Sequence, residues 1–192
     1  MKLRLRRIQP SDFATLMSWI HTNEELVQWS GPWNFVFPLD EGQLSKFFLT
    51  EKLDDTIHRS QFIAFDEDTG EPVGQIGFGR IWLRTASAYL GPVIVAPALR
   101  GKGVGLTMMQ EILRIGFDQL RLHRIELVVF DFNKPAIACY EKAGFRTEGL
   151  LREIVRMGDV YWNWQAMSIL ASEFEVLGLS SSSTISPSKG HD

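Results

Sequence analysis

The stretch that decides the fold is residues 90–120, which read LGPVIVAPALRGKGVGLTMMQEILRIGFDQL. It begins with an apolar segment, from Leu90 to Val95, that has the composition of a buried strand. A glycine-rich run follows at residues 100–105, and from Leu106 the apolar residues recur at the spacing of a helix. The sequence therefore predicts a strand that leads through a glycine loop into the N-terminus of a helix.

Such a loop is a common anion site, because the first N–H groups of a helix lack intrahelical partners and its dipole adds partial positive charge. Gly101, Gly103 and Gly105 remove the side chains that would keep a phosphate from the backbone, and Arg100 and Lys102 add two positive charges. We therefore predict that the loop binds a pyrophosphate. A glycine-rich turn without a ligand is the alternative.

Two common phosphate motifs do not fit this loop. A P-loop needs Ser or Thr after its lysine, whereas Gly103 follows Lys102, so no hydroxyl is supplied for Mg²⁺. A dinucleotide fingerprint needs its third glycine at the position of Leu106, and Gly105 comes one residue early. The phosphates are therefore expected to belong to another kind of ligand.

Two further patterns occur in order along the chain. The first is Arg-x-x-Gly-x-Gly at residues 100–105, after an apolar strand and Pro97. The second is Asn-x-x-Ala-x-x-x-Tyr-Glu-Lys-x-Gly-Phe at residues 133–145. Together they resemble the GNAT superfamily of N-acetyltransferases. The resemblance extends over residues 3–172, and the layout is similar to the branch of ribosomal-protein N-terminal and polyamine acetyltransferases.

The resemblance implies an α+β fold with a mixed, mostly antiparallel twisted sheet, helices on both faces and central strands that splay apart. Pro92 agrees with such a break, because proline cannot donate a ladder hydrogen bond. In the family the pantetheine arm of acyl-CoA enters where the strands part, so the backbone at Ile94 and Val95 is expected to pair with it. The alternative is an ordinary β-bulge.

The resemblance also implies that acetyl-CoA is the co-substrate, and no metal is expected. The cofactor-binding residues carry over as Ile94, Val95, Arg100, Gly101, Lys102, Gly103, Val104, Gly105, Asn133 and Tyr140.

Tyr140 lies two helical turns after Asn133, and by resemblance its hydroxyl is the general acid that protonates the leaving thiolate. The alternative is a buried helix tyrosine bonded to a carbonyl. Asn133 is expected to hydrogen-bond the cofactor, and an asparagine before a helix is also a good cap. Cys139 points about 100° away from Tyr140 around the helix, so we predict a core cysteine rather than a nucleophile.

The general base has no clear motif. Relatives in the family place a glutamate near the central strand, where this chain has Ser87, Ala88 and Tyr89. Glu126 on the neighbouring strand is a candidate, beside Tyr89 and a chain of waters. Transfer is expected to proceed by direct attack in a ternary complex, because no Ser/His/Asp or Cys/His nucleophile set is present.

An aromatic cluster between residues 27 and 38 is the candidate acceptor site. It contains Trp29, Trp33 and Phe35, and in the family this region forms one wall of the acceptor site. A core lid over the sheet is the alternative. The acceptor stays open between a protein N-terminus and a small-molecule amine such as a polyamine, an amino acid or an aminoglycoside.

We therefore predict an acyl-CoA-dependent N-acetyltransferase that acts on a primary amine. A non-catalytic acyl-CoA-binding sensor would keep residues 100–105 and dispense with Tyr140 and a base. A plain nucleotide-phosphate binder would bind adenosine diphosphates as tightly as CoA.

Composition sets the remaining expectations. The chain has 192 residues and a formal net charge of -3, which gives no reason to expect nucleic-acid binding. No apolar run approaches the roughly 20 residues that span a bilayer, so no membrane partner is expected. A single cysteine fits a reducing compartment, and we expect a cytoplasmic protein. Homodimers are common in the family, although no residue here argues for one.

We expect a single acetyltransferase-like domain over residues 1–172. A C-terminal extension over residues 173–192 is Ser-rich and is expected to be disordered from about residue 180.

Overall fold

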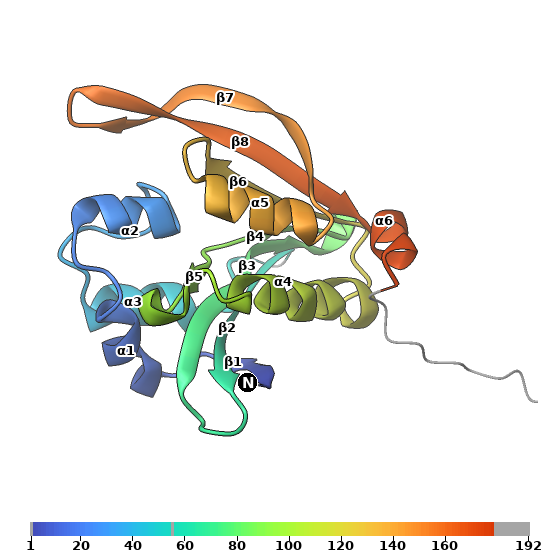
Figure 1. Cartoon of the computed structure of the whole chain (residues 1–192), viewed down its shortest axis with the longest axis horizontal. Coiled ribbons are helices and arrows are strands. Elements are labelled where there is room, and N and C mark those ends of the chain that lie inside the picture. The colour runs from blue at the N-terminus through green and yellow to red at the C-terminus, as the bar shows by residue number, and fades with distance from the viewer. Residues whose placement is uncertain (1, 55, 179–192) are drawn as a thin grey trace, which may run out of the picture.

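The computed structural model describes residues 2–54 and 56–178, in which an eight-stranded sheet is flanked by helices (Figure 1). The strands are β1 (Leu3–Arg7), β2 (Ile57–Asp66), β3 (Pro72–Trp82), β4 (Ser87–Leu90), β5 (Ile94–Val95), β6 (Arg124–Phe130), β7 (Arg146–Met157) and β8 (Val160–Leu170). The helices are α1 (Phe13–Met17), α2 (Asn23–Ser30), α3 (Glu41–Phe48), α4 (Val104–Arg114), α5 (Lys134–Lys142) and α6 (Ala171–Val176). A π-helical turn, Ile115–Gln119, continues α4, and short 3-10 turns cover Pro10–Asp12, Leu83–Thr85 and Pro97–Leu99.

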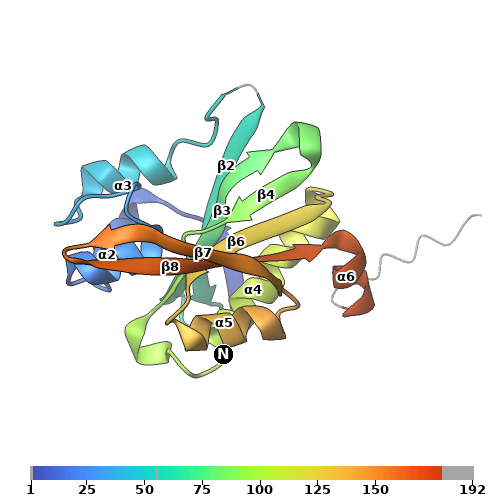
Figure 2. The same ribbon diagram turned by 90° about the horizontal axis from the view of Figure 1, so that it is seen from above.

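The sheet has the strand order β1-β2-β3-β4-β6-β8-β7, and β5 pairs with β3 beside this path. All pairs are antiparallel except β4 with β6, which run parallel. The strand direction turns steadily from β2 to β8, so the sheet is strongly twisted (Figure 2). The expected mixed, mostly antiparallel and twisted sheet is confirmed.

Helices cover both faces of this sheet. Successive residues of a strand point to opposite faces, so one strand can contribute side chains to the packing on both. On β2, Phe62 and Ala64 belong to the larger hydrophobic core, which α4 contributes to with Met108, Met109, Ile112 and Leu113. Ile63, between them, belongs to a second core that it shares with residues of α1, α2 and α3. The two larger cores therefore pack against opposite faces of the sheet.

The segment expected to be one strand from Leu90 to Val95 is two strands. β4 pairs with β6 from Ser87↔Arg124 to Tyr89↔Glu126, and the ladder stops where Gly91 and Pro92 follow. β5 then pairs with β3, through Gly74↔Val95 and Gln75↔Ile94, while the rest of β6 pairs only with β8. Because Pro92 cannot donate to a ladder, the two halves of the sheet part here. The expected splayed central strands are confirmed.

The C-terminal helix α6 packs on the domain. Phe174 is buried, and its ring lies 4.9 Å from that of Phe117, centroid to centroid. The packed part of the chain therefore continues past residue 172, where we expected the extension to begin. The tail expected to be disordered from about residue 180 lies outside the described residues.

Candidate active site

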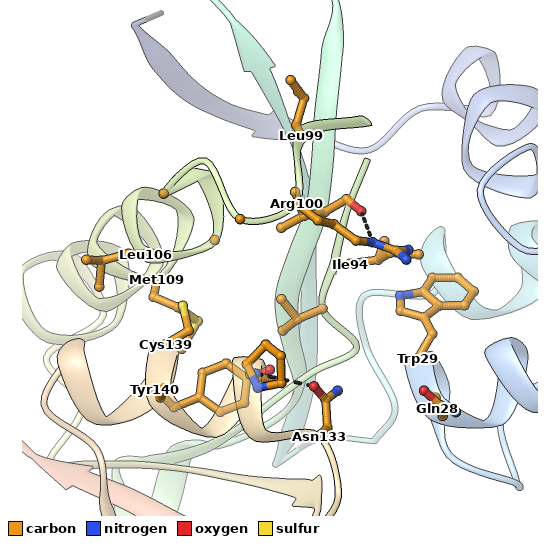
Figure 3. A pocket seen from close by; sticks show the side chains of 18 of the residues that line it. Gln28, Trp29, Ile94, Leu99, Arg100, Leu106, Met109, Asn133, Cys139 and Tyr140 are labelled. Atoms are coloured by element: carbon orange, nitrogen blue, oxygen red, sulfur yellow. Dashed lines mark hydrogen bonds between the residues drawn. The ribbon is translucent and has the colours of Figure 1, made fainter. Parts of the chain in front are cut away.

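Two cavities adjoin where the sheet divides. The first, of about 680 Å³, lies between the glycine loop, β5 and α5, and we call it the loop-side cavity (Figure 3). The second, of about 520 Å³, lies between α2 and the strands β3, β4 and β6, and we call it the strand-side cavity. Both are lined by Gln28, Trp29, Val93, Asn133, Ala136 and Tyr140. At the split in the sheet, the two cavities thus meet at this shared set of residues.

The glycine loop is shaped for an anion. Gly101 has φ +76 and Gly103 has φ +83, a left-handed conformation that side chains disfavour, and a Cβ at either position would meet no atom within 4 Å. Gly103 is the N-cap of α4 and no side chain caps this helix end. The first N–H groups of α4 are therefore left for a ligand, and an open cradle lies beside them. This geometry fits the diphosphate of CoA.

The other predicted loop residues divide into two groups. Arg100 and Gly105 line the loop-side cavity with Gly101 and Gly103, and Arg100 Nε donates to the Val95 carbonyl at 3.3 Å. Figure 3 shows the Arg100 side chain extending towards Ile94, across the cavity from Leu106. Lys102 is exposed and lies outside the lining.

Val104 points away from the site. Its side chain is buried in the larger core, because it begins the apolar face of α4. Only its backbone N–H is therefore left for a ligand, and the prediction for Val104 is restricted to that group. The backbone of β5 lies across the cavity, and Ile94 and Val95 both line it.

Tyr140 lies at the meeting point of the two cavities, and Figure 3 shows its ring pointing towards the space beside Asn133. Burial raises the pKa of Tyr140, and the nearby Cys139 and Tyr89 raise it further. Its hydroxyl therefore keeps its proton at neutral pH. Among residues 2–54 and 56–178, the Tyr140 hydroxyl makes no hydrogen bond to a carbonyl.

Asn133 caps α5, because its side-chain oxygen accepts a hydrogen bond of 3.3 Å from the Ala136 N–H. Cys139 also lines the loop-side cavity, although we expected it to face away from the space that Tyr140 faces. The cavity wraps far enough around α5 to reach both residues. Burial raises the pKa of the Cys139 thiol, which argues against a thiolate nucleophile.

A row of polar side chains crosses the floor of the strand-side cavity. Arg80, Tyr89 and Glu126 are register neighbours on β3, β4 and β6, so they share one face of the sheet. Burial raises the pKa of Tyr89 to about 12. Glu126 accepts from Arg124 at 3.0 Å, and Glu148 holds the same guanidinium through contacts of 2.6 and 2.7 Å.

The three aromatic residues predicted for the acceptor lie in different surroundings. Trp29 lines both cavities, and Trp33 is 68% exposed and lines the strand-side cavity, with its ring edge-on to Trp164 at 5.3 Å. Phe35 is buried in the second core, where its ring stacks on Trp29 at 5.3 Å. The core-lid alternative therefore describes Phe35, which supports the wall without lining it.

Sequence reasoning missed the strand-side residues Arg59, Arg80 and Trp164, which also line the cavity. Arg80 and Trp164 stand at ordinary alternating positions of strands, and nothing local distinguishes them from surface residues. Only the assembly of the sheet brings these three side chains to one space.

A split sheet with a glycine loop and an uncapped helix beside it defines the class of acyl-CoA-binding acetyltransferase folds. The sequence model of the acetyltransferase (GNAT) family matches residues 23–145, so the chain belongs to this family.

Individual relatives agree with this assignment. The chain is 31% identical over 122 residues to the probable N-acetyltransferase YjcK of Bacillus subtilis, covering 64% of this chain and 66% of the relative. It is 37% identical over 82 residues to the spermidine N(1)-acetyltransferase of Vibrio cholerae, covering 43% and 47%. The chain thus spans between about half and two thirds of the length of these two curated relatives.

The structural similarity is more extensive. The crystal structure of spermidine N-acetyltransferase from Vibrio cholerae in complex with CoA and spermine superposes with a TM-score of 0.76 at 25% identity, covering 90% of this chain and 98% of that one.

Two further observations concern the described part of the chain. Within residues 2–54 and 56–178, no helix is both long and apolar enough to cross a membrane. In the same ranges, no three His, Cys, Asp or Glu side chains gather closely enough to hold a metal ion.

Proposed function

We propose that this protein transfers an acetyl group from acetyl-CoA to a primary amine, by direct attack within a ternary complex. The observation that carries this proposal is the junction of two cavities at the split in the sheet, where Val93, Asn133 and Tyr140 line both. One cavity ends in an anion cradle and the other is open to a second substrate. Such an arrangement brings two ligands together without a covalent enzyme intermediate.

The loop-side cavity is assigned to CoA. The N–H groups at the start of α4 would hold its diphosphate over Gly101 and Gly103, and the backbone of Ile94 and Val95 would pair with its pantetheine arm. Acetyl-CoA supplies the activated acetyl group as a thioester. The Asn133 amide nitrogen, which has no partner among the described residues, is free to donate to the same ligand.

Proton transfers are assigned to two side chains. Tyr140 keeps its proton because its pKa is raised, so its hydroxyl is the donor for the departing thiolate. Tyr89 is a poor base near neutral pH because its pKa is raised to about 12. We therefore assign removal of the proton of the amine to Glu126, directly or through water, since Glu126 lines the strand-side cavity. A single cysteine in the chain supports a cytoplasmic setting for this chemistry.

The test is thiol release from acetyl-CoA across a panel of amines, with wild type beside Tyr140→Phe, Glu126→Gln and Gly103→Glu. We expect release that depends on the acceptor, and a loss in all three variants. No release with any amine, together with CoA binding that Gly103→Glu abolishes, would replace the enzyme by an acyl-CoA sensor. Equal affinity for adenosine diphosphate and CoA would indicate a plain nucleotide-phosphate binder.

A further inference from the structure

Two arginines line the strand-side cavity without an acidic partner. Arg59 comes from β2 and Arg80 from the neighbouring strand β3. Neither makes an ion pair with any acidic side chain in residues 2–54 and 56–178, although most other arginines that line or flank the sheet do. Arg59 is half-buried, so its charge is only partly solvated. The cavity therefore presents two cations that the described chain does not neutralise.

Arg59 is held in place by neutral groups only. Its Nη1 donates to the Phe47 carbonyl at 2.6 Å, its Nε donates to the Gly79 carbonyl at 3.3 Å, and its guanidinium lies 3.9 Å from the centre of the Phe47 ring. These contacts use two of the five N–H donors of a guanidinium and supply no negative charge. Burial lowers the pKa of Arg59, and the charge of Arg80 lowers it further. Two close cations in a partly desolvated place favour an anion between or beside them.

The one carboxylate in the lining does not fill this role. Glu126 is separated from Arg80 by Tyr89 in the register of the sheet, and its charge is engaged by Arg124. Arg124 is itself bound by Glu148, so this group of one guanidinium and two carboxylates carries one net negative charge. The strand-side cavity thus has a cationic end at Arg59 and Arg80, and on the other side of Tyr89 an acidic end at Glu126, which is already ion-paired with Arg124.

We infer that the acceptor is a primary amine that carries a carboxylate, which Arg59 and Arg80 bind while the amine lies at the junction beside Tyr140. This inference rests on the acetyl transfer proposed above and names its substrate class. Guanidinium groups match a carboxylate with paired, charge-assisted hydrogen bonds. A polyamine would instead bring further positive charge to two arginines, which is unfavourable. The carboxylate belongs either to a free amino acid or to an acidic side chain near a peptide N-terminus.

The experiment compares acceptors that differ only in the carboxylate. Free leucine is paired with leucinamide, and a short amidated peptide beginning Met-Asp is paired with one beginning Met-Asn, with spermidine as a third arm. We expect kcat/KM to favour the carboxylate member of one pair about tenfold or more, chiefly through KM. The first pair would identify a free amino acid, and the second an acidic peptide. Amidation makes an α-amine less basic and thus easier to deprotonate, so this preference would run against intrinsic reactivity.

Variants locate the preference. Arg80 is exposed, so Arg80→Gln is expected to fold. This variant should lower kcat/KM for the preferred acid about tenfold, while kcat/KM for the matching amide should change less than about twofold. Arg59→Gln should act in the same direction. The matched control is Arg84→Gln, which removes one charge from an exposed residue that lines neither cavity. It should leave kcat/KM unchanged for both the acid and the amide.

Binding separates this inference from the proposed activity. Calorimetry of the acid and its amide with CoA-loaded protein should show weaker binding of the acid in Arg80→Gln, whether or not turnover occurs. Preference for spermidine or for the amides, or equal binding of the acid to wild type and Arg80→Gln, would overturn the inference while leaving acetyl transfer intact. If the acid binds in a manner that depends on Arg80 but no amine is turned over, the proposed activity is overturned, whereas recognition of a carboxylate by Arg80 is supported.

Discussion

Gln75 donates a hydrogen bond of 2.7 Å to Gln61 in the interior of the protein, beside the point where the sheet divides. Both side chains are almost fully buried. Gln75 also accepts from the Trp29 indole at 3.1 Å, and Gln61 donates to the Gly91 carbonyl at 3.1 Å. A continuous polar chain thus connects the wall of both cavities to the residue before Pro92. Such networks, once satisfied, fix one arrangement of a core.

Breaking this chain should cost stability. In Gln61→Leu, the Gln75 amide loses its acceptor and the Gly91 carbonyl loses its donor, and both stay buried. We expect the free energy of unfolding to fall by about 1–3 kcal/mol, measured by urea denaturation. Gln119→Leu, at an exposed position, is the control. A fall of less than about 0.5 kcal/mol in Gln61→Leu would show that the network contributes little.

The Gly103→Glu variant needs a control with the same backbone cost. Gly70→Glu is this control. Gly70 also has a positive φ, of +76, with open space around its Cβ position, and it lies in a hairpin turn outside the lining of either cavity. Both variants should lose similar stability, about 1–2 kcal/mol. Only Gly103→Glu should weaken CoA binding, by more than about tenfold, because its carboxylate repels the diphosphate. Equal CoA affinity in the two variants would show that the loop does not bind the diphosphate of CoA.

Tyr140→Phe removes one oxygen at the junction. We expect kcat to fall about a hundredfold while the dissociation constant of CoA changes less than about twofold, since the hydroxyl serves proton transfer rather than binding. Tyr161→Phe, at an exposed position on β8, should change neither quantity. Because the pKa of Tyr140 is raised, wild-type kcat should not decline as the pH rises to the ordinary phenol value near 10. Unchanged kcat in Tyr140→Phe would exclude it as the acid.

Alkaline pH should destabilise the protein through Tyr89. Its pKa is about 12 in the folded chain and 10.0 without burial, so the unfolded chain loses this proton first. The stabilisation is complete below pH 10 and is lost as the pH rises from 10 to 12. Thermal melts over that interval should show a steeper decline in wild type than in Tyr89→Phe. Parallel declines would mean that Tyr89 titrates normally.

Acid pH acts through Glu148 in the opposite direction. Hydrogen bonds from Arg124 and Ser168 lower the pKa of Glu148 to about 2. Its stabilisation is present above the ordinary pKa of 4.5 and is lost as the pH falls from 4.5 to 2. The side chain is 44% exposed, so water screens the pair and Glu148→Gln should cost less than about 1 kcal/mol at pH 7. The difference from wild type should vanish at pH 2; a constant difference across this interval would contradict the assignment.

Several elements followed from local patterns alone. Residues 124–130 and 160–170 form strands, because their apolar residues alternate or run continuously between clear turns. Apolar residues at helical spacing continue from Phe13 to Ile20, yet α1 ends at Met17, because helix ends depend on weak local preferences. The strand predicted over residues 90–95 is interrupted, since a run of apolar side chains does not reveal which neighbour its backbone pairs with.

What the sequence determined by itself is therefore the loop and its family. The geometry of the loop is encoded within six residues, because glycines occupy the positions of positive φ just before the helix begins. The tertiary structure alone decided the acceptor side. Arg59, Arg80 and Glu126 lie on three different strands, and only the assembly of the sheet places them around one cavity. Local conformation is encoded by neighbours along the chain, whereas pairing across strands is set by the burial of the whole core.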